Sequence, residues 1–87
     1  MLQLNRRHPL FDESMELLCT LSRKETPLSL LTIDFGYATP DGVKRLIDKL
    51  KRRGVDIRVE PKTVRIGIQG WREAKRECED YWRRVYG

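Results

Sequence analysis

Basic side chains that could bind a polyanion are concentrated in one stretch of the chain. Residues 39–66 contain nine Lys or Arg and four Asp or Glu, a net charge of +5, whereas the other 59 residues carry nine of each sign. A cationic helix followed by a cationic β-ribbon suits a duplex polyanion, with the helix in the major groove and the ribbon against phosphates. The alternative is a solvated helix face whose charges pair with one another. The confinement of the excess charge to one segment favours nucleic acid.

Residues for catalysis or metal binding are sparse. The single histidine, His8, offers no His pair for a metal, and a catalytic triad would depend on it alone. Cys19 and Cys78 with that one histidine do not have the spacing of a zinc site. The segment with Gly67 and Gly70 does not contain the Lys and the Ser or Thr that a phosphate-binding loop needs. We therefore expect no enzyme activity, no cofactor and no metal.

Length and composition limit the possible classes of protein. A chain of 87 residues makes one domain with a small core, and its 36% charged residues suit an ordered, soluble domain. No stretch approaches the roughly 20 apolar residues needed to span a bilayer. The segment MLQLNRRHPLF lacks an apolar signal core, so we expect a cytoplasmic protein with reduced thiols that serve as small apolar side chains.

Apolar periodicity predicts two helices in the first half, after an amino-terminal arm that would be ordered only if Leu10 and Phe11 dock. The first helix covers residues 13–24, with Asp12, Glu13 or Ser14 as its cap. The second covers about 27–35, starting at Thr26-Pro27 and ending at Gly36, with Leu28, Leu31 and Phe35 inward and Leu30 partly so. A strand through LLTIDF is the alternative, since Thr32, Ile33 and Phe35 favour strands.

A third helix and a hairpin follow, and they carry the cationic stretch. Thr39 caps the helix, which covers residues 39–53 and ends at Gly54, with an apolar stripe of Val43, Leu46, Ile47 and Leu50. Strict alternation then predicts a two-stranded hairpin over 55–68, turning at Glu60-Pro61-Lys62-Thr63. Its apolar side chains should bury against the helices and leave three cations facing out. The apolar set is Val55, Ile57, Val59, Val64, Ile66 and Ile68, and the cations are Arg58, Lys62 and Arg65.

A last helix covers residues 71–86 and has a long apolar stripe. Its six apolar positions exceed what one small core readily absorbs, so a symmetric dimer is one use of the surplus. Packing across the chain's own first helix, with Cys78 near Leu18, is the other. The candidate dimer residues are Trp71, Cys78, Tyr81, Trp82 and Val85.

The order helix, helix, helix, hairpin predicts a mainly α fold with a small β-hairpin, a winged helix-turn-helix plus a C-terminal helix. The stretch GYATPDGVKRLIDKLKRRGVDIRVEPKTVRIGI resembles the amino-terminal winged-helix domain of biotin operon repressors and related small regulators. The likeness covers about residues 14–68 and includes Leu50-Lys51-Arg52-Arg53-Gly54-Val55-Asp56. Residues 1–87 would form a single domain, with a core of 12–69 and a packing or dimerisation helix of 70–87. These 87 residues leave no room for a ligase domain, so we expect DNA binding and no biotin chemistry from the resemblance.

The resemblance implies that the third helix recognises double-stranded DNA. Base-edge candidates are Thr39, Asp41, Lys44, Arg45 and Lys49, and Arg45 can make a two-pronged bond to guanine. Arg52, Arg53, Arg58, Lys62 and Arg65 would contact phosphates. For Asp41 a helix-capping role is the alternative, and for Tyr37 both a phosphate contact and plain packing remain open.

Two other functions remain as alternatives to a sequence-specific transcription regulator. A protein-interaction module would use the aromatic C-terminal helix as its docking surface. Binding of double-stranded RNA is disfavoured, because side chains on a helix cannot read the deep, narrow RNA groove.

Overall fold

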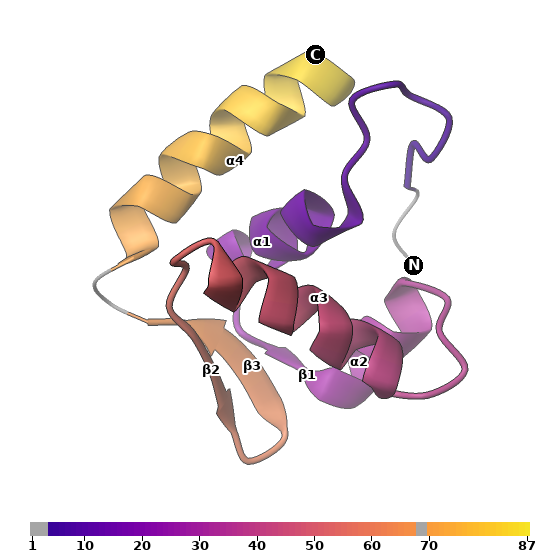
Figure 1. Ribbon diagram of the computed structural model, residues 1–87, viewed down its shortest axis with the longest axis vertical. Coiled ribbons are helices and arrows are strands. Elements are labelled where there is room, and N and C mark those ends of the chain that lie inside the picture. The colour runs from indigo at the N-terminus through magenta and orange to yellow at the C-terminus, as the bar shows by residue number, and fades with distance from the viewer. Residues whose placement is uncertain (1–3, 68–69) are drawn as a thin grey trace.

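The computed structural model describes residues 4–67 and 70–87 (Figure 1). The described part contains four helices and a small three-stranded antiparallel sheet, which confirms a mainly helical fold with a small β portion. The radius of gyration, 12.1 Å, matches the roughly 12 Å expected of one domain of this length. The elements in chain order are α1 (Glu13–Arg23), β1 (Thr26–Pro27), α2 (Leu28–Asp34), α3 (Asp41–Arg52), β2 (Ile57–Glu60), β3 (Thr63–Ile66) and α4 (Trp71–Val85).

Helix α1 is the centre of the core. It packs against α3, α4 and β3, and Leu17, Leu18 and Leu21 on it are at most 1% exposed. Asp12 caps its start, because the Asp12 carboxylate accepts a hydrogen bond from the Ser14 amide at 2.9 Å. The predicted first helix is therefore confirmed, and Asp12 is the cap among the three candidates.

Both threonines that were expected to start helices lie outside them. Thr26 and Pro27 form strand β1, and Thr39 precedes the cap position of α3, which Pro40 occupies. Neither α2 nor α3 has a side-chain capping bond. The predicted Thr39 cap is wrong.

Glycines end both α2 and α3, as predicted. Gly54 has φ of 91°, and behind it the Val55 amide donates to the Leu50 carbonyl at 3.0 Å, closing a Schellman motif. Gly36, with φ of 75°, ends α2 in the same way. The strand alternative for residues 30–35 is excluded, because α2 covers Leu28–Asp34.

The sheet has one strand more than the predicted hairpin. Its order is β1-β3-β2, with Thr26 opposite Val64, so β3 is the central strand. The Leu28 amide also donates to the Lys62 carbonyl at 2.7 Å, which fastens the hairpin turn to the start of α2. Two residues before a helix give no periodicity from which a strand could be predicted.

The apolar face of the hairpin is buried along β3 and only in part along β2. Ile57, Val64 and Ile66 are at most 6% exposed, whereas Val59 is 41% exposed. The predicted burial of Val59 is wrong, because β2 is an edge strand and the helices do not cover this position. Val55 is half-buried, and Ile68 lies outside the described residues. Leu30 of α2, expected partly inward, is 46% exposed.

Helix α4 packs along α1 of its own chain (Figure 1). Cys78, Tyr81 and Val85 are buried there, and the Cys19 thiol lies 3.9 Å from the Cys78 carbonyl oxygen. Both thiols are free. Three of the five candidate dimer residues thus lie inside this chain's own core; Trp71 is half-buried and Trp82 is 40% exposed.

The amino-terminal arm is held by polar contacts. The Asn5 amide donates to the Tyr86 hydroxyl at 3.2 Å, and the Arg6 guanidinium donates to the Phe35 carbonyl at 3.0 Å and pairs with Glu13. Leu10, one of the two residues expected to dock, is 54% exposed. The arm therefore links α4 to α1 and to the end of α2.

Candidate nucleic-acid interface

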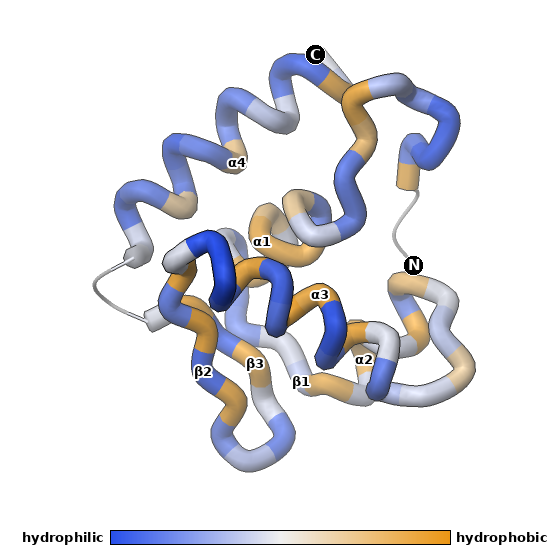
Figure 2. The backbone as a smooth tube through the Cα atoms, viewed as in Figure 1, coloured by the Kyte–Doolittle hydropathy of each residue, from blue (hydrophilic) through white to orange (hydrophobic). Residues whose placement is uncertain are grey.

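Helix α3 separates its apolar and charged side chains completely. Val43, Leu46, Ile47 and Leu50 are at most 5% exposed, as predicted. Every charged side chain of the helix is exposed. Figure 2 shows strongly hydrophilic and hydrophobic positions alternating along α3, as expected for a helix with one face in the core.

The exposed side of α3 is organised in rows. Residues seven apart almost superimpose on a helix of 3.6 residues per turn, so side chains with this spacing share a row. One row contains Lys44 and Lys51, and another contains Arg45 and Arg52. At 100° per residue, the row of Asp41 and Asp48 falls between them. The two acids are thus flanked by cations on both sides.

The cations of α3 form no close ion pairs in the described part of the chain. Within the described residues the ion pairs closer than 4.0 Å are Arg6–Glu13, Arg58–Asp56 and Arg65–Glu60, and none involves α3. From 41 to 53 the chain has six cations and two acids, a net charge of +4. The Arg53 side chain differs from the rest, because its guanidinium contacts the Met15 sulfur at 3.4 Å.

The hairpin has little net charge, and two of its three cations pair with carboxylates. Arg58 and Arg65 lie directly opposite each other, so they share one face of the sheet. Arg58 lies 3.6 Å from Asp56 and Arg65 lies 3.1 Å from Glu60, and residues 54–66 have a net charge of only +1. Such exposed ion pairs are worth at most about 1 kcal/mol, so a stronger anion could replace the carboxylates.

Tyr37 is committed to contacts inside the chain. Its hydroxyl donates to Glu13, and partial burial together with this hydrogen bond raises the pKa of Tyr37 to about 12. Its ring lies over Gly42, where a Cβ atom would come within 2.3 Å of the ring carbon Cδ1. Of the two roles expected for Tyr37, the packing role is the one observed.

Glu13 connects this contact to the charges of α3. Burial raises the pKa of Glu13, but the hydrogen bond from Tyr37, the Arg6 guanidinium and the charge of Lys49 together hold it below its ordinary value of 4.5. Lys49 therefore lies on the side of α3 that is nearer the start of α1, where it is balanced in part by this carboxylate.

The fold brings most of the predicted site residues to two neighbouring elements. Lys44, Arg45, Lys49 and Arg52 are exposed on α3, which contacts β2 of the hairpin (Figure 1). Arg58 and Lys62 are exposed, as predicted, whereas Arg65 is half-buried; Thr39 is exposed in the loop before α3. Lys51 was missing from the predicted set, although its seven-residue spacing from Lys44 is a signal for it.

Metal binding and membrane spanning can also be considered for the described part of the chain. No group of three or more His, Cys, Asp or Glu there could hold a metal ion. None of the helices in residues 4–67 and 70–87 has the length and apolarity needed to cross a membrane. Comparisons with known protein families, with curated proteins and with solved structures find no match.

Proposed function

We propose that this protein binds double-stranded DNA sequence-specifically as a winged helix-turn-helix and acts as a small transcription regulator. Helix α3 would enter the major groove, and the β2–β3 hairpin would serve as the wing. The observation that carries the proposal is the exposed side of α3, where five cations lie without an ion-pair partner among the described residues. Because such a surface gains most from releasing the counterions of a polyanion, a duplex is its best-matched ligand.

The rows on α3 support this orientation. A helix in the major groove has phosphates on both flanks and base edges in front of its outermost face. Asp41 and Asp48 lie near the centre of the exposed face. In the groove this position faces base edges, so the two carboxylates would lie away from the negatively charged phosphates. Lys44 and Lys51 on one side suit a phosphate backbone, and Arg45 is the candidate for a two-pronged bond to guanine, worth about 1–3 kcal/mol of discrimination.

The wing would contribute phosphate contacts that fix position without reading sequence. Lys62 is exposed at the hairpin turn. Arg58 and Arg65 oppose each other on one face, an arrangement in which like charges repel unless an anion is shared between them. A phosphate oxygen would relieve this repulsion more fully than Asp56 and Glu60 do, since charge-assisted Arg–phosphate bonds are strong.

The test begins with selection of bound duplexes from a random DNA pool. Binding of the selected duplex is then measured by fluorescence anisotropy across a salt series, for the parent and for Lys44→Ala/Arg45→Ala. We expect that double variant to bind about 10- to 100-fold more weakly, with a salt slope shallower by about 0.9, because Lys44 is the one phosphate contact that it removes.

The matched control is Arg72→Ala/Arg76→Ala, which removes the same charge from exposed positions on α4. It should bind the selected duplex within about twofold of the parent, because these side chains lie outside α3 and the hairpin. An equal loss of affinity in both double variants would mean that the protein attracts DNA only through its overall charge. Binding independent of salt, or no binding near about 50 mM salt, would reject the proposal. Tighter binding to an A-form RNA duplex would do the same.

A further inference from the structure

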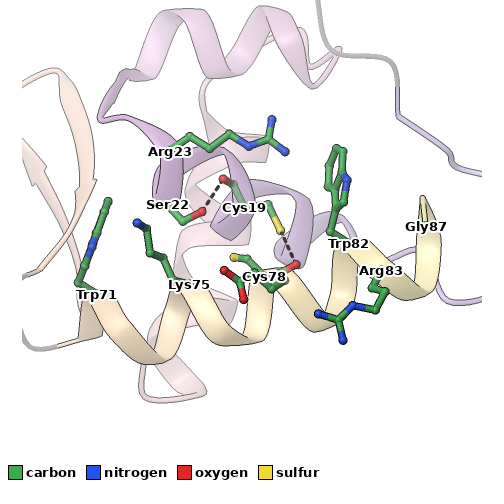
Figure 3. Close-up of a pocket in the computed structure, with 10 residues that line it drawn as sticks. Cys19, Ser22, Arg23, Trp71, Lys75, Cys78, Trp82, Arg83 and Gly87 are labelled. Carbon is green, nitrogen blue, oxygen red and sulfur yellow. Dashed lines mark hydrogen bonds between the residues drawn. The ribbon is translucent and has the colours of Figure 1, made fainter.

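A groove runs between α1 and α4 and includes no residue of α3 or of the hairpin (Figure 3). Its volume is about 710 Å³, within the range of sites that hold a ligand. The chain's two tryptophans, Trp71 and Trp82, both line it, and Figure 3 shows them at opposite ends of α4 with Cys19 and Cys78 between them. The two tryptophans are eleven positions apart on α4, a rise of about 16 Å or three helical turns along its axis.

The groove is cationic as well as apolar. Arg23, Lys75 and Arg83 line it with a single acid, Glu79, which gives a net charge of +2. None of the four takes part in an ion pair within 4.0 Å among the residues that the structure describes. A second copy of the chain would bring an equally cationic groove, so pairing two grooves face to face would set like charges against one another. The charge instead matches an acidic partner.

The contacts of Trp82 decide between an acidic peptide and a single nucleic-acid strand. The Tyr86 ring stacks on Trp82 with centroids 4.1 Å apart, and the Arg23 guanidinium lies 4.6 Å from the same centroid. Both groups therefore lie where a base stacked on this indole would have to lie. A base needs a free aromatic face on which to stack, whereas apolar side chains can pack against an indole edge.

We propose that this groove binds an acidic amphipathic helix of a partner protein. Aliphatic side chains of the partner would lie along the floor between Trp71 and Trp82, and its carboxylates would lie over Arg23, Lys75 and Arg83. The span of about three turns is the length over which a helix presents apolar residues at i, i+3, i+4, i+7 and i+11. The site is separate from the proposed DNA surface, so both can be occupied at once.

The experiment titrates the full chain with a synthetic acidic amphipathic peptide of about 18 residues, with leucines on one face and glutamates on the other. Because Trp71 and Trp82 are the only tryptophans and both line the groove, intrinsic fluorescence reports occupation directly. We expect saturable binding. Lys75→Glu/Arg83→Glu should weaken it by at least about tenfold, since both cations would become repulsive. The affinity of that variant for duplex DNA should stay within about twofold of the parent, so a failure of the groove proposal can be told from a failure of the DNA-binding proposal.

The matched control is Arg72→Glu/Arg76→Glu, which makes the same charge change on α4 at exposed positions outside the groove. It should bind the peptide within about twofold of the parent. The proposal is overturned if the control loses as much affinity, or if a peptide of the same composition with scrambled order binds equally well. It is also overturned if a single-stranded oligonucleotide binds more tightly and responds to the same variants, which would make the groove a nucleic-acid site.

Discussion

Glu13 and Glu16 lie one turn apart on α1, yet their surroundings shift their ionisation in opposite directions. Glu13 is partly exposed and held below its ordinary pKa by Tyr37 and Arg6, although its partial burial opposes them. Glu16 is only 4% exposed, and burial raises its pKa above 4.5 even though the Tyr86 hydroxyl donates to it. The charged form is therefore favoured at Glu13 and disfavoured at Glu16 in the folded chain.

Opposite pH dependences of stability follow for the two glutamates. A carboxyl group whose pKa is lowered by folding stabilises the fold above pH 4.5, and this contribution is lost as the pH falls through the folded pKa. A carboxyl group whose pKa is raised by folding stabilises the fold below pH 4.5, and this contribution is lost as the pH rises through the folded pKa. At pH 7 we expect Glu13→Gln to lower the free energy of unfolding and Glu16→Gln to raise it. The difference for Glu13→Gln should narrow as the pH falls below 4.5 through the lowered folded pKa, whereas the difference for Glu16→Gln should already narrow above 4.5, as the pH falls through the raised folded pKa.

Urea unfolding of both variants and the parent between about pH 3 and pH 8 measures these differences. Glu77→Gln, at an exposed position on α4, is the control and should follow the parent throughout. A Glu16→Gln protein less stable than the parent at pH 7 would show that its hydrogen bond outweighs the cost of burying the charge.

At the scale of elements, the contact between Tyr37 and Gly42 joins the α2–α3 loop to the first turn of α3. Replacing an exposed helical glycine by alanine usually stabilises a protein by about 1 kcal/mol. Here the new Cβ would meet Cγ and Cδ1 of the Tyr37 ring, atoms close to its backbone that cannot easily move away. We expect Gly42→Ala to destabilise the fold by about 1–3 kcal/mol instead.

A double-mutant cycle with Tyr37→Ala isolates this contact. With the ring removed, Gly42→Ala should recover its ordinary stabilising sign, as measured by the midpoint of urea unfolding. If Gly42→Ala destabilises equally in both backgrounds, the steric contact with Tyr37 is not the cause.

Elements with a clear periodicity could be predicted from the sequence. The apolar stripe and terminal glycine of α3 were enough to predict its buried face and its C-terminal end, though not its start, and Asp12 was among the three cap candidates for α1. Strand β1 could not be predicted, because it consists of two residues whose partner Val64 lies far along the chain. The exposure of Val59 depends in the same way on which edge of the sheet the helices cover.

The two candidate surfaces, the exposed side of α3 and the groove between α1 and α4, also differ in how far the sequence predicts them. The cations of α3 belong to one helix, so spacing alone placed them together. The groove needs α1 and α4 side by side, which apolar stripes permit but do not specify. For α4 the sequence left a dimer and packing within the chain both open, and intramolecular packing on α1 is what the structure contains.

For the molecule as a whole, α1 connects both candidate surfaces to one core. Leu18 on it is fully buried, and α1 contacts α3, α4 and β3. Leu18→Ala should therefore lower the free energy of unfolding by about 2–5 kcal/mol, which corresponds to a fall in Tm of at least about 8 °C.

Scanning calorimetry checks this prediction, because one core implies a single transition with equal calorimetric and van't Hoff enthalpies. Leu30→Ala, at a position 46% exposed on α2, is the matched control and should lower the free energy of unfolding much less than Leu18→Ala does. Two separate transitions would mean that α4 and the helix-hairpin part unfold independently.

The small sheet ends on both sides in strands that are poor templates for a further strand. On one side β1 is two residues long and includes a proline, which has no amide hydrogen to donate. On the other side β2 exposes Arg58 and Glu60, charges that disfavour alignment with a neighbouring chain. Strand-by-strand aggregation is thereby discouraged at both borders, even though Val59 leaves one apolar side chain in water.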